Sequence, residues 1–137
     1  MTTDLPFLDT NILIRHLAGD HPEQSPRCRD LLLELETGAR SAWTSHLVVA
    51  EAVFVLARLY QFERQQIADV LLPLIELPGL KLPRKRLFRR VFELFTTTAL
   101  SYPDCYHGAL SERSGEPRIL SYDKGFDRLG TVKRIEP

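Results

Sequence analysis

Apolar and polar positions repeat along the chain with two periods, one typical of strands and one typical of helices. The run "LPFLD", residues 5–9, is a short apolar stretch that ends in an acid, and "NILIRHLA", residues 11–18, spaces its apolar residues as a helix does. The pattern therefore predicts a strand followed by a helix at the start of the chain.

Helical and extended segments continue to alternate. The helices are predicted at residues 25–38, 46–59, 66–77, 84–100 and 102–115, and the strands at residues 42–45, 80–82, 118–123 and 132–136. Such alternation favours an α/β fold with a mainly parallel sheet and helices on both faces. Because 137 residues without a visible linker or repeat suit a single core, we expect one domain, residues 1–137.

Several helix ends carry recognisable signals. Ser25 is predicted to cap the helix that Gly38 ends, and Ser45 to cap the helix that contains Glu51. Pro103 and Asp104 are predicted to open the last helix. Each of these signals marks where a helix begins or ends.

Glu51 lies inside the apolar run "HLVVAEAVFVLARL", which surrounds it on every helical face. Carboxylates are rarely buried unless they are paired or bind a metal. We therefore expect Glu51 to have a partner.

Three other acids occupy comparable places. Asp9 ends the first predicted strand, Asp104 opens a late helix, and Asp123 ends "ILSYD". Ligands of parallel α/β sheets bind at the carboxyl ends of the strands, and clustered carboxylates repel one another unless a cation neutralises them. Mg²⁺ or Mn²⁺ is the cation that suits such oxygen ligands.

Each acid also has a simpler structural explanation. Asp9 and Asp104 are good helix caps, Asp123 is a common turn residue, and Glu51 can be a helix acid with an ordinary hydrogen bond. The joint placement of all four acids is what favours a metal site.

The ordered motifs resemble those of the PIN-domain family, and within it the VapC-type toxins of prokaryotic toxin–antitoxin pairs. The resemblance rests on "FLDTNILI", "VVAEAVFVL", "YPDCYHGAL" and "ILSYDKGFDRLG", followed by "VKRIEP". It implies a three-layer α/β/α sandwich, a Mg²⁺- or Mn²⁺-dependent endoribonuclease, and an antitoxin that binds near the active site. Asp9, Glu51, Asp104 and Asp123 match the family's acidic quartet, and Asn11 and Ser121 match the polar residues beside it.

Two positions depart from the family pattern. Ser121 stands where threonine is common, which keeps the hydroxyl, and Pro103 precedes the third acid where a small residue is usual. Pro103 puts the direction of the Asp104 side chain in question. Asp127 is an alternative to Asp123 as the fourth acid.

A ribonuclease also needs cationic side chains for RNA phosphates. The segment "KLPRKRLFRR" offers a group of them without an acid: Arg84, Lys85, Arg86, Arg89 and Arg90. A solvated helix face explains the same charges equally well. Arg15 and Lys124, which neighbour the acid motifs, are alternative phosphate contacts.

Bulk properties narrow the classes of protein. The 18 basic and 18 acidic residues balance, so total charge neither favours nor excludes nucleic acid. We expect a soluble cytoplasmic protein with no membrane span, in which Cys28 and Cys105 stay reduced. A homodimer is the default expectation for a small soluble chain.

Two other functions remain open from the sequence. A catalytically silent PIN-like module would bind RNA or protein without cutting it. A phosphohydrolase of the haloacid dehalogenase kind also begins with a strand-end aspartate, but its chemistry needs a second aspartate where this chain has Asn11.

Overall fold

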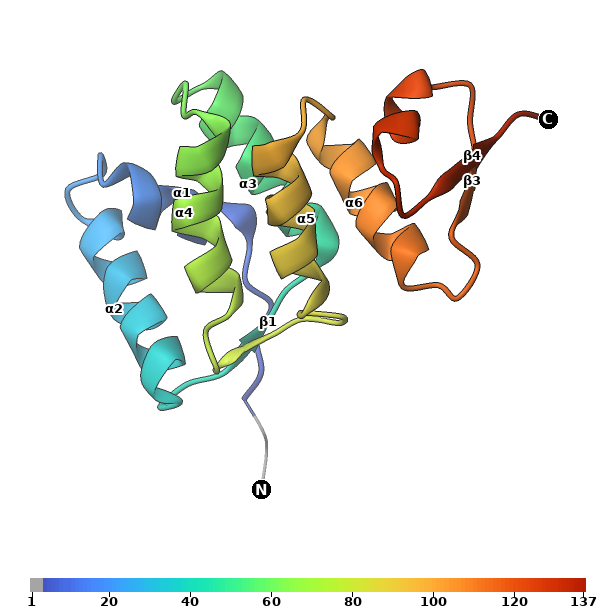
Figure 1. Cartoon of the computed structure of the whole chain (residues 1–137). Helices are drawn as coiled ribbons and strands as arrows, with labels where there is room; N and C mark the ends of the chain where they lie inside the picture. The colour runs from blue at the N-terminus through green and yellow to red at the C-terminus, as the bar shows by residue number, and fades with distance from the viewer. Residues whose placement is uncertain (1–3) are drawn as a thin grey trace. The chain divides into compact units, whose positions relative to one another are not determined.

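The chain folds into two compact units, each with its own pair of short parallel strands. The computed structural model describes residues 4–137, divided into an N-terminal unit, Met1–Lys85, and a C-terminal unit, Arg86–Pro137. The N-terminal unit contains α1 (Thr10–Ala18), α2 (Gln24–Thr37), β1 (Ala42–Trp43), α3 (His46–Arg58), α4 (Arg64–Ile75) and β2 (Leu80–Lys81) (Figure 1). The C-terminal unit contains α5 (Leu87–Thr97), α6 (Tyr102–Glu112), β3 (Arg118–Leu120), the 3₁₀ helix η1 (Lys124–Arg128) and β4 (Lys133–Ile135).

The extended segments of the N-terminal unit pair in parallel. β1 and β2 pair in parallel, with Ala42 opposite Leu80. The predicted first strand is reduced to a single parallel bridge between Phe7 and Trp43, flanked by hydrogen bonds from Trp43 N to Pro6 O and from Leu8 N to Trp43 O. This bridge directs the chain into α1.

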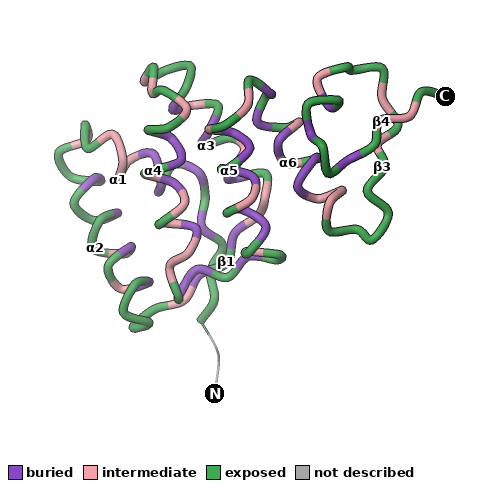
Figure 2. Tube along the Cα trace, viewed as in Figure 1, coloured by how far each residue is buried: buried purple, intermediate pink, exposed green. Residues whose placement is uncertain are grey.

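The helices of this unit bury one face each. α1 packs on α2 and α3, and α3 packs on α4. In Figure 2 the trace of α2 alternates between buried and exposed, as expected of a helix with one covered face. Ser45 caps α3 as predicted, because its hydroxyl accepts a hydrogen bond from Val48 N at 3.2 Å. The predicted cap at Ser25 is wrong, since α2 begins one residue earlier, at Gln24, with Glu23 at the cap position.

The C-terminal unit is built on the contact between α5 and α6. Phe92, Phe95 and Tyr102 pack their rings together, with centroids 5.8–6.1 Å apart. β3 and β4 pair in parallel, with Ile119 opposite Arg134. Gly108 of α6 lies so close to Leu129 that an added Cβ would be 2.5 Å from its Cδ1, so this glycine permits the close packing.

The predicted α/β class is confirmed, and both strand pairs are parallel. In the part of the chain that the structure describes, the strands form two separate pairs, so the continuous central sheet and the single domain stay predictions. Cys28 and Cys105 are buried free thiols. Within residues 4–137, no helix has the length and apolar character needed to cross a membrane.

One buried hydrogen bond should decide the stability of the N-terminal unit. Thr44, which is 1% exposed, donates its hydroxyl proton to Leu8 O at 2.9 Å. Thr44→Val should lower the free energy of unfolding by about 1–3 kcal/mol, because a buried carbonyl loses its partner. Denaturant unfolding followed by the fluorescence of Trp43, the chain's single tryptophan, measures this change.

The matched control is Thr37→Val. Thr37 is exposed and its hydroxyl bonds only to nearby backbone, so its loss should cost less than about 0.5 kcal/mol. Equal effects of the two substitutions would contradict the role of Thr44.

Candidate functional site

The N-terminal unit contains a hollow of about 380 Å³ where α1 faces α3. It is lined by Asp9, Thr10, Asn11, Ile14, Arg15, Glu51, Val55, Leu59 and Tyr60. Three residues predicted from the sequence, Asp9, Asn11 and Glu51, therefore lie around one opening. We call it the N-terminal hollow.

Asp9 occupies the cap position of α1 without capping the helix. Its backbone is extended, with φ −82° and ψ 158°, and its side chain makes no capping hydrogen bond. The carboxylate is exposed. Helix capping therefore does not explain Asp9, and both of its oxygens are available to a ligand.

Glu51 is exposed, so the expectation that its apolar neighbours bury it is wrong. α3 buries Val49, Ala52, Val53 and the residues in register with them. It leaves the opposite side, with Leu47 67% and Phe54 61% exposed, facing solvent together with Glu51.

The expected partner of Glu51 does exist. Thr10, which is 6% exposed, donates its hydroxyl proton to Glu51 Oε2 at 2.9 Å. Thr10 shares a helical face with Leu13 and Ile14, both buried, so its hydroxyl needs a partner. That position within "DTN" is the signal by which the sequence could have identified Thr10.

Tyr60 lies on the rim of this hollow. Its phenol donates a hydrogen bond to Asp20 Oδ2 at 3.2 Å. Loss of hydration, and then the hydrogen bond and negative charge of Asp20, raise the pKa of Tyr60. The phenol is therefore a neutral donor at physiological pH.

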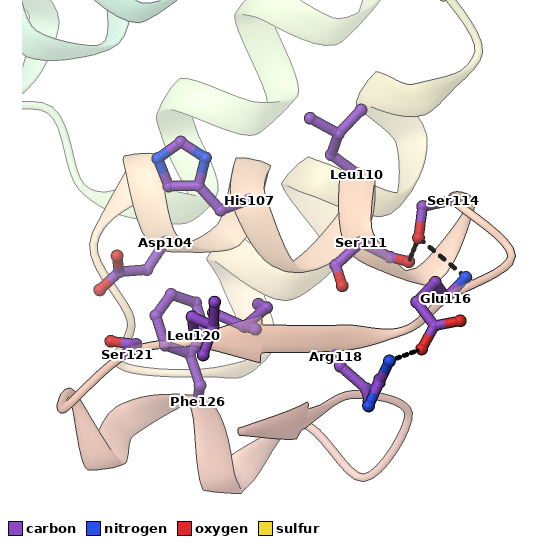
Figure 3. Close-up of a pocket in the computed structure, with 11 residues that line it drawn as sticks. Asp104, His107, Leu110, Ser111, Ser114, Glu116, Arg118, Leu120, Ser121 and Phe126 are labelled. Carbon is purple, nitrogen blue, oxygen red and sulfur yellow. Dashed lines mark hydrogen bonds and ion pairs between the residues drawn. The ribbon is translucent and has the colours of Figure 1, made fainter. Parts of the chain in front are cut away.

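The C-terminal unit has a larger hollow, of about 630 Å³, between α6 and β3 (Figure 3). Figure 3 shows Asp104 and Ser121 at the same end of it, on facing elements. The other lining residues are His107, Leu110, Ser111, Ser114, Glu116, Arg118, Ile119, Leu120 and Phe126. We call it the C-terminal hollow.

Asp104 is half-buried and does not cap its helix. α6 begins at Tyr102, and the cap is Ser101, whose hydroxyl accepts a hydrogen bond from Asp104 N at 3.3 Å. Pro103 and Asp104 therefore lie in the first turn of α6, as predicted, but the helix-cap explanation of Asp104 is wrong because Ser101 is the cap. The Asp104 carboxylate is therefore not needed to cap α6.

Asp123 is the N-cap residue of the 3₁₀ helix η1. Its Oδ1 accepts a hydrogen bond from Gly125 N at 2.8 Å, and its N–H donates to Ser121 Oγ at 2.9 Å. Asp123 is exposed and is not among the residues that line the C-terminal hollow. The structural explanation thus accounts for one of its two oxygens.

Asp127 is held by Arg134. Nε and Nη2 of Arg134 donate to the two carboxylate oxygens at 3.0 and 3.3 Å. Hydrogen bonds from Arg134 to Asp127 and Glu136 raise the pKa of Arg134. Because both oxygens of Asp127 are engaged, it is a poorer candidate ligand than Asp123.

The basic segment divides between structural contacts and exposed charges. Lys85 donates to Leu77 O at 2.5 Å and to Leu80 O at 2.8 Å, and burial, followed by the charge of Lys81, lowers its pKa. Arg90 is ion-paired with Glu112 and Glu93. Arg84, Arg86 and Arg89 are exposed. Their binding of RNA stays a prediction.

The four predicted acids are oxygen ligands of the kind that Mg²⁺ binds, and each unit contains two of them. Each unit offers exposed or half-buried oxygens, Asp9 and Glu51 in one and Asp104 and Asp123 in the other. Across residues 4–137 no three His, Cys, Asp or Glu side chains gather as a ready metal cage. Mg²⁺ is commonly held by one or two carboxylates together with waters and substrate phosphates, so these donors fit it.

Comparisons with known proteins point in one direction. The family model described as "PIN domain" matches residues 7–132. The chain is also similar to a protein named VapC ribonuclease from Aquifex aeolicus (strain VF5). The two are 23% identical over 133 residues, which cover 97% of each chain.

Asp123 and Asp127 should respond differently to neutralisation. Asp127→Asn should lower the free energy of unfolding by about 0.5–1 kcal/mol, because it breaks a partly exposed ion pair. Asp123→Asn keeps the oxygen that accepts from Gly125, so its effect should stay within about 0.5 kcal/mol. Thermal denaturation of the two variants measures both. A larger loss for Asp123→Asn would make that carboxylate structural.

Proposed function

Because the chain belongs to the PIN-domain family, we propose that it is a divalent-metal-dependent endoribonuclease and the toxin of a type II toxin–antitoxin pair. Family membership and the similarity to VapC ribonuclease support a nuclease. The single observation that carries the finer proposal is the N-terminal hollow. Asp9 and Glu51 are 42 positions apart in the sequence, and both line this hollow with exposed side chains. Asp9 makes no capping hydrogen bond, and the hydrogen bond to Glu51 comes from a neutral hydroxyl.

The metal would be Mg²⁺ or Mn²⁺. When bound, such an ion acts as a Lewis acid and lowers the pKa of a coordinated water. Asp9 and Asp104 would be its direct ligands, and Glu51 and Asp123 would complete the shell through waters or at a second ion. Asn11 and Ser121 are the proposed supporting polar residues.

The chain's own groups would orient the reactants. Thr10 fixes one oxygen of Glu51 by a hydrogen bond of 2.9 Å, which leaves the other oxygen to accept a proton from the attacking water. An in-line attack also needs the phosphodiester held opposite that water, so cationic side chains should neutralise its charge. The proposed contacts with RNA phosphates are Arg84, Lys85, Arg86, Arg89 and Arg90.

An antitoxin is the proposed protein partner, and α3 offers it a surface. Leu47, Glu51, Phe54 and Arg58 follow one another at helical spacing, and the Arg58 guanidinium lies 5.4 Å from the Phe54 ring centroid. Exposed apolar side chains beside a functional acid suit an amphipathic partner segment. A partner on this face would cover Glu51.

Three further features belong to the same proposal: a three-layer α/β/α arrangement, a homodimer and action in the cytoplasm, where RNA substrates are found. The comparisons do not favour a silent binding module or a dehalogenase-like phosphohydrolase.

Metal-dependent cleavage is the decisive test. The purified chain should produce discrete new ends in total cellular RNA with Mg²⁺ or Mn²⁺ and none with a chelator. Asp104→Asn should reduce cleavage by more than about 100-fold, because it removes a metal ligand without removing a helix cap. Sequencing of the RNA ends measures both effects.

The control is Asp30→Asn, which neutralises an exposed acid of α2 outside the N-terminal hollow. It should cleave as the unaltered chain does. Wild-type cleavage by Asp104→Asn would overturn the acid's assignment, and metal-independent ends would overturn the mechanism.

The antitoxin surface predicts a second result. Phe54→Asp should weaken binding of the cognate antitoxin by at least about tenfold, because a charge replaces a central apolar contact. Leu33→Asp, at a residue of α2 that is 50% exposed, is the control and should bind normally. Calorimetric titration measures both affinities. Equal affinities would remove α3 as the docking surface.

A further inference from the structure

The N-terminal hollow contains a guanidinium as well as two carboxylates. Arg15 lines it together with Asp9 and Glu51. Asn11 and Arg15 are four residues apart on α1 and therefore project from the same side of the helix. The hollow thus carries groups of both signs.

Arg15 is held in place from α2. Its Nε donates to Gln24 Oε1 at 3.0 Å. A guanidinium has five N–H donors, and this bond uses the one nearest the aliphatic chain. The four donors of the two Nη groups remain, on a side chain whose freedom is already reduced.

The charge of Arg15 is not consumed by an ion pair. Among the described residues no carboxylate forms a salt bridge with it, although Asp9 and Glu51 line the same hollow. Arg90 and Arg134 show the opposite case, since each is paired with two acids. An ion pair would neutralise the guanidinium and a carboxylate together. Because they are not paired, the guanidinium can bind an anion and the carboxylates can bind a cation.

We propose that Arg15 binds a phosphate of the RNA backbone at the N-terminal hollow, and that Gln24 is its positioning residue. The inference rests on the proposed ribonuclease function. Carboxylates alone repel a polyanion, while the planar guanidinium fork matches two non-bridging phosphate oxygens. Bound in this way, Arg15 would hold the phosphodiester beside Glu51 and stabilise the negative charge that grows on it during attack.

Binding can be tested without cleavage. A labelled single-stranded RNA oligonucleotide of random sequence is titrated against Glu51→Gln, with and without Arg15→Gln. Arg15→Gln should weaken binding and reduce the slope of log affinity against log salt by about 0.7, the value for one lost phosphate contact. Arg27→Gln, at an exposed arginine of α2 outside the hollow, is the matched control. A titration identical to that of Arg27→Gln would overturn the inference.

Cleavage provides the second readout. Arg15→Gln should lower kcat/KM by about 10²–10³ because a positioned donor to the developing charge is lost. Arg15→Lys should recover much of the binding and less of kcat, since a point charge replaces the fork. Gln24→Ala should lower kcat and leave the salt slope unchanged, because the charge remains and only its position is released. Circular dichroism of each variant checks that the fold is retained.

The outcomes separate the two proposals. If the unaltered chain cleaves RNA and Arg15→Gln cleaves as well as Arg27→Gln does, the assignment of Arg15 fails and the ribonuclease stands. If the unaltered chain does not cleave RNA with either metal, the ribonuclease fails, and the salt titration still decides whether Arg15 contacts phosphate.

Discussion

The backbone pairing of residues 6–8 with Trp43 is the constraint on which the N-terminal hollow depends. This pairing fixes the point at which the chain leaves an extended conformation and enters α1. The hydroxyl of Thr44 adds a further hydrogen bond to the same segment, at Leu8 O. Asp9 follows immediately, and the first turn of α1 then carries Thr10 to Glu51. A few buried hydrogen bonds thereby bring together groups 41 residues apart.

The acids of this chain differ in how far the fold already uses them. Both oxygens of Asp127 accept hydrogen bonds from Arg134, and one oxygen of Asp123 caps η1. Within residues 4–137, the Asp9 side chain makes no capping hydrogen bond, and the cap of the helix that contains Asp104 is Ser101. A carboxylate that lines an open hollow and does not cap a helix has oxygens with which it can bind a ligand.

Local signals predicted much of this structure. The positions of β1, β2, β3 and β4, the Ser45 cap and the end of α2 at Gly38 follow from periodicity and helix-end chemistry. What the sequence could not provide depends on distant partners. The bond from Thr10 to Glu51 and the clamp of Arg134 on Asp127 join separate elements. The exposure of Glu51 was missed because an apolar run does not reveal which of its faces is covered.

The capping of α6 by Ser101 also bears on how such a chain can change over evolutionary time. Folding of this helix does not rely on the acid at position 104, so that acid can be exchanged without loss of the helix start. A descendant with asparagine there would keep its shape and its surfaces. The carboxylate at position 104 and the start of α6 are therefore independent of one another.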